Sequence, residues 1–108
     1  MSSRTRALSK QQFELIAKAL ADPRRFELLQ TIAGFEDYPC SRLCKEFPVS
    51  KATVSHHAKE LVRAGLVEAD RCGQYVNFRV RRDVLAAYTA ALHERLSPTE
   101  LPAKSITA

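Results

Sequence analysis

The chain has 108 residues and a formal net charge of +5 at pH 7, from 17 Lys and Arg against 12 Asp and Glu. A chain of this length forms one domain with a modest core, which excludes the multidomain architectures of most large enzymes. Its 45% hydrophobic and 27% charged residues are typical of a globular protein rather than a disordered one. The basic excess points to a polyanionic partner.

Targeting and redox signals are sparse in this sequence. No stretch approaches 18 apolar residues, and residues 1–10 are polar, so we expect neither a membrane segment nor a secretory signal. The three cysteines form no CxxC pair, which argues against a disulfide framework and favours a reducing compartment. We therefore expect a cytoplasmic protein with no membrane partner, and no pattern indicates a cofactor.

Two helices are predicted in the first third of the chain. Ser9, followed three residues later by Gln12, has the pattern of a capping box at the start of the first helix. Asp22 and Pro23 form a strong start signal for the second, as N-cap and first helical residue. Gly34 supplies its C-terminal stop.

A short helix and a longer one follow, joined by a brief turn. The third helix is predicted from near Pro39 to a point before Pro48, because proline disfavours helix in the residue before it. Ser50 caps a fourth helix that runs to Gly65. A brief turn of this kind, at residues 47–50, lets the second helix of the pair project into a groove of DNA.

The remaining chain is predicted to form a hairpin and a closing helix. Residues 66–71 and 75–80 have strand patterns, with a turn at 72–74 between them, and Asp83 is placed to cap the last helix. The predicted fold is mostly α with a small β-hairpin, a winged helix-turn-helix in the order α-α-α-α-β-β-α. It spans residues 9–96, between a flexible N-terminus at 1–8 and a flexible tail at 97–108.

Positive charge is concentrated in residues 42–82, which hold nine basic and four acidic residues, while the rest of the chain is balanced. Such a concentration is typical of a nucleic-acid surface, although a basic solvated face is the alternative. The nine are Arg42, Lys45, Lys51, Lys59, Arg63, Arg71, Arg79, Arg81 and Arg82.

The fourth helix has two chemically different faces. At 100° per residue, Val54, Ala58 and Leu61 share the side expected to face the core. The opposite side and the first turns carry the predicted DNA contacts, with a solvent-exposed face as the alternative. These are Lys51, Thr53, Ser55, His56, Lys59 and Arg63 on the helix, with Arg71 and Gln74 on the hairpin.

Histidines offer little evidence for catalysis. His57 falls at the edge of the core side, where we expect a packing or hydrogen-bonding group rather than one that contacts bases. Ser55, His56 and His57 are the only candidate nucleophile–base cluster, but they point in different directions without a carboxylate to orient them. We therefore expect no enzymatic activity.

Two runs carry a family resemblance: KALADPRRFELLQTI at 18–32 and VSHHAKELVRAGLVEADRCGQYVNFRV at 54–80. From about Leu15 to Leu92 the chain resembles ArsR/SmtB-type bacterial transcriptional regulators. The resemblance implies a homodimer that pairs through its first and last helices and represses a promoter at a pseudo-palindromic double-stranded DNA site. It further implies release by a metal ion, metalloid or oxidant. From the residues alone, a winged-helix module that binds RNA or a protein partner stays open.

Apolar positions on the two terminal helices also favour a homodimer, because they exceed what a small core needs. They are Phe13, Ile16, Leu20, Leu85, Tyr88 and Leu92.

The metal-binding motifs of the resembled family are not matched. The positions of its C-x-C motif fall on Pro39 and Ser41, so both thiolates are missing. Its last-helix site would start at Asp83 and place its two histidines at Leu85 and Leu96. One carboxylate does not hold zinc, so no metal site is predicted.

Cysteines are the remaining candidates for a sensor. Cys40 and Cys44 lie one helical turn apart, where oxidation or a soft ion could reach both, and the helix dipole is expected to lower the pKa of Cys40. Both also lie on the apolar stripe of Leu43 and Phe47, so a structural role is the alternative. Cys72, at the hairpin turn, is expected to be exposed and either reactive or incidental.

Overall fold

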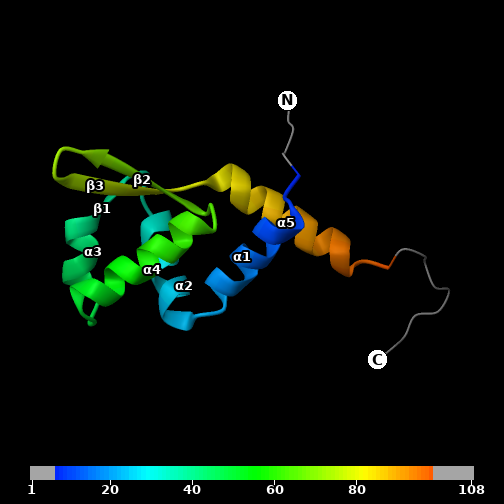
Figure 1. The fold of residues 1–108 in the computed structure, drawn as a ribbon, viewed down its shortest axis with the longest axis horizontal. Coiled ribbons are helices and arrows are strands. Elements are labelled where there is room, and N and C mark those ends of the chain that lie inside the picture. The colour runs from blue at the N-terminus through cyan, green and yellow to red at the C-terminus, as the bar shows by residue number, and fades with distance from the viewer. Residues whose placement is uncertain (1–6, 99–108) are drawn as a thin grey trace.

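The structure is a computed structural model that describes residues 7–98. Within this range it contains five helices and one three-stranded antiparallel sheet (Figure 1), and the predicted winged helix-turn-helix is confirmed. The elements are α1 Lys10–Leu20, α2 Pro23–Ala33, β1 Tyr38–Pro39, α3 Cys40–Glu46, α4 Lys51–Arg63, β2 Val67–Cys72, β3 Tyr75–Val80 and α5 Arg82–Leu96. Residues 1–6 and 99–108, most of the two predicted flexible ends, lie outside the described residues.

Side-chain caps set the starts of three helices where the sequence predicts them. Ser9 Oγ accepts a hydrogen bond from the amide of Gln12 (3.0 Å) at the start of α1. Asp22 Oδ1 accepts from the amides of the second and third residues of α2, at 2.9 and 3.2 Å. Ser50 Oγ accepts from the amide of Thr53 (3.1 Å) at the start of α4. Each cap satisfies amides that have no partner inside the helix.

The predicted two-stranded hairpin is present, and a third strand that was not predicted pairs with it. Tyr38 and Pro39 form β1, which pairs antiparallel with β3 in the register Tyr38↔Phe78 and Pro39↔Asn77. The strand order is therefore β1-β3-β2. A strand of two residues has no alternating pattern, so the sequence could not reveal it.

Asp83 does not cap the last helix, so that prediction is wrong. Helix α5 begins at Arg82, and its N-cap residue Arg81 makes no side-chain cap bond. The Arg81 guanidinium donates to both carboxylate oxygens of Asp83, at 3.2 and 3.1 Å. This bidentate pair occupies the carboxylate that the capping hypothesis assigned to helix amides.

Most of the core lies between α2, α4 and the sheet, with α1 and α3 closing its sides. In Figure 1 the hairpin and α3 lie at one end of the molecule, and α1 with α5 lies at the other. None of the described helices is long and apolar enough to cross a membrane. The largest fully buried side chains are Tyr38, Ile16, Leu28, Ile32, Leu43, Leu61, Leu66 and Val54.

Gln12 connects α1 to the C-terminal end of α4. Its side chain does not bond back to Ser9, as a complete capping box requires, and instead donates from Nε2 to the carbonyl of Ala64 (3.3 Å). The next residue, Gly65, has a φ of 86°, a left-handed conformation that favours glycine. This short segment therefore sets how the chain leaves α4 and enters β2.

Substituting Gly65→Ala should lower the free energy of unfolding by about 1 kcal/mol or more, because alanine is strained at positive φ. The added Cβ would also lie only 2.6 Å from Gln12 Nε2. Gly34→Ala is the matched control: its φ is −73° and the nearest atom to its new Cβ lies at 3.5 Å, so stability should stay equal or rise slightly. Urea denaturation measures both variants, and equal stabilities would contradict this account.

Candidate nucleic-acid interface

Helix α4 presents one side to the core and the other to solvent. Val54, His57, Ala58 and Leu61 are buried. The exposed side chains are Lys51, Ala52, Ser55, His56, Lys59, Val62 and Arg63. This division matches the predicted orientation of the helix.

The candidate DNA contacts on α4 differ in exposure and in whether they already bond to another residue. Lys51, Ser55, His56 and Lys59 are exposed, and no side-chain hydrogen bond or ion pair joins any of them to another described residue. The Thr53 hydroxyl lies 2.9 Å from Ser50 Oγ and is half-buried, so it belongs to the helix cap. Arg63 lies 3.9 Å from the Glu60 carboxylate in an exposed and therefore weak ion pair.

The wing ends in a turn of two residues, one fewer than predicted. Cys72 pairs with Tyr75 in the sheet, which leaves Gly73 and Gln74 as the turn. Gly73 has a φ of 64°, and a positive φ at the first turn residue is what type II′ hairpins require. Arg71 and Gln74 are exposed, as the DNA-binding hypothesis needs.

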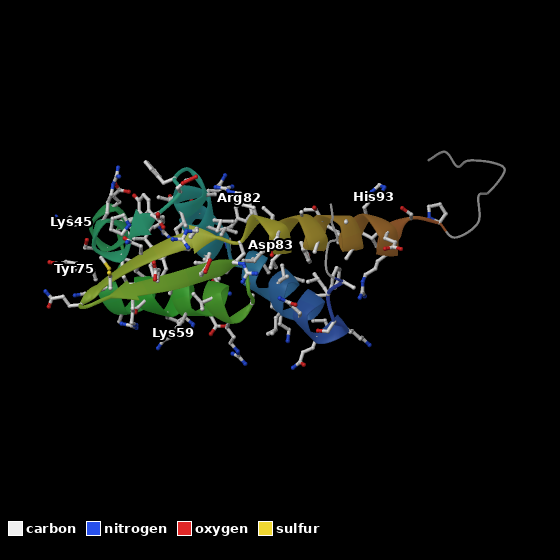
Figure 2. All side chains as sticks on the ribbon, turned by 90° about the horizontal axis from the view of Figure 1, so that it is seen from above. Lys45, Lys59, Tyr75, Arg82, Asp83 and His93 are labelled. Atoms are coloured by element: carbon white, nitrogen blue, oxygen red, sulfur yellow. The ribbon has the colours of Figure 1, made fainter. Side chains whose placement is uncertain are left out.

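Tyr75 and Lys45 are further candidates, and neither was among the predicted DNA contacts. Tyr75 is 67% exposed beside the wing tip, where its ring is accessible to a partner. Figure 2 shows Tyr75 and Lys45 at the same end of the molecule. Only the packing of α3 against β3 brings them together, since they are far apart in the chain.

Several basic residues of 42–82 are not free to bind a partner, because acidic side chains pair with them. Arg79 lies 2.7 Å from Asp37 and 3.5 Å from Glu68, and its pKa is raised by the hydrogen bond to Asp37. Asp37 lies outside residues 42–82. The same holds for Asp83, which forms the ion pair with Arg81.

Five of the nine basic side chains make no ion pair with a described residue. Of these, Arg82 donates to the carbonyl of Ala33 (3.0 Å), and it lies on the edge opposite Lys59 in Figure 2. The four that remain for a partner are Lys45, Lys51, Lys59 and Arg71.

His57 is a buried packing residue, as predicted. Only 8% of its surface is exposed, and its Nδ1 accepts a hydrogen bond from Arg25 Nε (3.4 Å). Burial lowers the pKa of His57, because the charged form loses its hydration. Arg25 also lies 3.9 Å from Asp22, the cap of α2, so His57 helps to join α4 to the start of α2.

Cys40 and Cys44 are half-buried neighbours on α3. Burial, followed by the adjacent Cys44, raises the pKa of the Cys40 thiol. The predicted lowering by the helix dipole is therefore wrong, because burial and the adjacent Cys44 both raise the pKa of Cys40. Cys72 is exposed, as predicted.

All three cysteines line one open groove of about 870 Å³ between α3 and the wing. Its other lining residues include Lys45, Lys51 and Gln74. The sequence could not show this groove, because Cys72 is far from Cys40 and Cys44 in the chain and reaches them through the β1–β3 pairing.

Comparisons with known proteins agree on one family. A model of a helix-turn-helix domain matches residues 20–69. Over 70 residues, 65% of this chain and 77% of the relative, the chain is 30% identical to the transcriptional repressor SdpR of Bacillus subtilis. Over 78 residues, 72% of this chain and 74% of the relative, it is 32% identical to the arsenical resistance operon repressor of Staphylococcus xylosus.

A solved structure extends the likeness to the fold. The homodimeric winged helix-turn-helix DNA-binding domain Mb0332 of Mycobacterium bovis, a possible ArsR-family regulator, superimposes with a TM-score of 0.60 at 25% identity. The match covers 84% of this chain and 89% of that one. The chain belongs to the ArsR family of transcriptional regulators.

Within this ArsR-family chain, only Asp83 offers a ligand at the expected metal-binding positions. Pro39 is the N-cap of α3 and Ser41 lies in its first turn, so the C-x-C positions supply no thiolate. Among residues 7–98, no group of three His, Cys, Asp or Glu side chains is placed to hold a metal ion.

Some of the apolar residues on α1 and α5 that were expected to form a dimer interface pack in this chain's own core instead. These residues therefore do not support a dimer. Ile16 and Tyr88 are buried, and the Tyr88 ring packs on Phe13 with centroids 5.1 Å apart. Leu92 and Leu96 remain exposed on α5, at 37% and 76%.

Protonation of His57 should destabilise the fold as the pH falls. Because its pKa is lower in the folded chain than the ordinary 6.5, stability is fully present above pH 6.5 and is lost as the pH falls through the folded value. We expect the melting temperature to drop between pH 7 and pH 5, and His57→Gln to flatten this dependence. His93→Gln, on an exposed part of α5, is the control; a flat profile for the unaltered chain would refute the assignment.

Proposed function

We propose that the chain is a homodimeric repressor that binds double-stranded DNA in a sequence-specific manner, with α4 in the major groove. The main support for this proposal is the outward face of α4, where Lys51, His56 and Lys59 are exposed and make no ion pair with a described residue. The opposite face of the helix is buried in the core. A B-DNA major groove accepts one α-helix, and the first turns of such a helix usually contact the bases.

The candidate residues divide by their position along α4 and the wing. Lys51, Ser55 and His56 lie on the first turns, where they suit base edges and nearby phosphates. Lys59 and Arg63, farther along the same face, suit phosphates. Thr53 supports the helix cap. Arg71 and Gln74 suit the flanking backbone or minor groove.

A homodimer would place two copies of α4 in successive major grooves, which suits a pseudo-palindromic site. The Mycobacterium bovis relative is homodimeric. In this chain, exposed Leu92 and Leu96 on α5 and a hollow lined by Leu8, Ala90 and Ala91 support pairing through α1 and α5.

Release by an inducer is the remaining part of the proposal. Cys40 and Cys44 are its candidate thiol receivers, because they are neighbours on α3 and α3 packs against α4. Oxidation of either thiol would add polar bulk beside Leu43, which is fully buried, and would disturb the support behind α4.

Replacing Lys59→Gln should weaken binding to all duplexes alike and reduce the salt slope by about 1 for each protomer. Lys18→Gln removes the same charge from an exposed position on α1 and should leave both quantities unchanged. Fluorescence anisotropy at several salt concentrations measures both. Equal slopes for the two variants would remove Lys59 from the interface.

Replacing His56→Ala tests sequence preference separately. If His56 contacts a base, the variant should lose about 1–3 kcal/mol of discrimination at one base position in each half-site. Selection from a randomised duplex pool, performed on both proteins, gives the comparison. An unchanged sequence preference would show that His56 does not contact a base. Binding of single-stranded RNA in place of duplex DNA would overturn the proposed function.

The double change Leu92→Glu/Leu96→Glu should convert the dimer to a monomer, because it places four carboxylates in one apolar interface. Val62→Glu, at a residue as exposed as Leu92 (37%) but on α4, should keep the dimer. Light scattering coupled to size exclusion reports the mass. A dimer that survives the double change would exclude this end of α5 from the interface.

A further inference from the structure

The groove between α3 and the wing combines thiols with unpaired cations. Its volume of about 870 Å³ falls within the range of about 300–1,000 Å³ that small-molecule sites occupy. Cys40 and Cys44 line it from α3, and Cys72 lines it from the wing. Apolar surface from Pro39 and Val76 completes it.

The three thiols are not equally accessible. Cys40 and Cys44 are half-buried on α3, and burial raises the pKa of Cys40, which lowers its thiolate fraction. Cys72 is exposed, and it ends β2 next to the two-residue turn. A reagent entering from solvent therefore meets Cys72 first.

Two lysines line the groove. They are Lys45 and Lys51, and neither makes an ion pair with a described residue. A groove of this charge selects anionic ligands over neutral ones of the same reactivity.

We propose that this groove captures the disulfide of an acidic low-molecular-weight thiol and that Cys72 forms a mixed disulfide with it. The Cys72 thiolate, its proton released to water, attacks one sulfur of the ligand disulfide. The ligand S–S bond breaks, a new S–S bond joins Cys72 Sγ to one half, and the other half leaves as a thiolate. Cys72 is oxidised and the released half is reduced.

The consequence for DNA rests on the proposed function. Lys51 and Gln74 line the groove and are also candidate DNA contacts, so an adduct on Cys72 covers part of the DNA surface. Its carboxylates would occupy the cations that DNA phosphates need. DNA and the captured thiol therefore compete directly, a second route of release that is separate from oxidation of Cys40 or Cys44 and requires no movement of α4.

Oxidised glutathione is the probe, because it is an acidic disulfide of suitable size. Incubation with the whole protein, followed by peptide mapping, should place one glutathione on Cys72 and none on Cys40 or Cys44. Bis(2-hydroxyethyl) disulfide is the neutral comparison. An adduct mainly on Cys40 or Cys44 would overturn the proposal.

Two sets of variants test the groove itself. Cys72→Ser should abolish the adduct, whereas Cys40→Ser/Cys44→Ser should retain it. Lys45→Gln/Lys51→Gln should slow labelling by oxidised glutathione about tenfold and leave labelling by the neutral disulfide unchanged. Lys10→Gln/Lys18→Gln, with the same loss of charge on α1, should slow neither; equal effects of the two pairs would refute capture by the groove.

Competition with DNA is measured separately. A bound duplex should protect Cys72 from labelling, and the adduct should weaken DNA binding by about tenfold or more, reversed by dithiothreitol. Each variant is compared with its own reduced form. If the reduced protein binds no duplex, the proposed function is wrong, and the labelling results still test whether the groove captures the disulfide. If the reduced protein binds DNA but the duplex does not protect Cys72, the proposed competition between DNA and the captured thiol is wrong.

Discussion

The burial of one side of α4 is the constraint on which the rest of the structure depends. Val54 and Leu61 are fully buried, and His57 and Ala58 are nearly so, among side chains from α2 and the sheet. A helix packed this closely cannot rotate without opening cavities in the core. The backbone positions that carry the outward residues His56 and Lys59 are therefore fixed relative to the rest of the fold.

Ion pairs separate the structural cations of this chain from those that are available to a partner. Arg79 is shared between Asp37 and Glu68, where it ties the segment before β1 to the two strands of the wing. Arg42 lies 2.9 Å from Glu46, and its guanidinium stacks near the rings of Phe35 and Tyr38. These arginines stabilise the scaffold, whereas the lysines around α4 remain for phosphates.

Local sequence signals predicted most of the fold. The caps at Ser9, Asp22 and Ser50 and the apolar spacing of α4 each act over a few residues, so they could be recognised in one sequence. Strand β1 was missed because two residues show no period. The role of Asp83 was misassigned because its partner Arg81 competes for the same carboxylate.

The candidate site was less accessible to prediction, because it depends on contacts between distant segments. Net charge over 42–82 could not reveal that Asp37 neutralises Arg79 across 42 positions of the chain. Nor could spacing show that Cys72 and Cys44 line the same groove. The sequence therefore indicated which residue types were present, and only the fold shows which of them remain unpaired.

The salt dependence of DNA binding tests the central claim, that Lys51, Lys59, Arg63 and Arg71 of each protomer bind phosphates while Arg42, Arg79 and Arg81 do not. The measurement is the affinity of the unaltered dimer for a duplex selected from a randomised pool, between 50 and 300 mM salt. Eight phosphate contacts predict a slope of log K against log salt of about −7. A slope near zero would contradict binding through the DNA backbone, and a slope of about −16 would show that all nine basic residues of 42–82 in each protomer engage DNA.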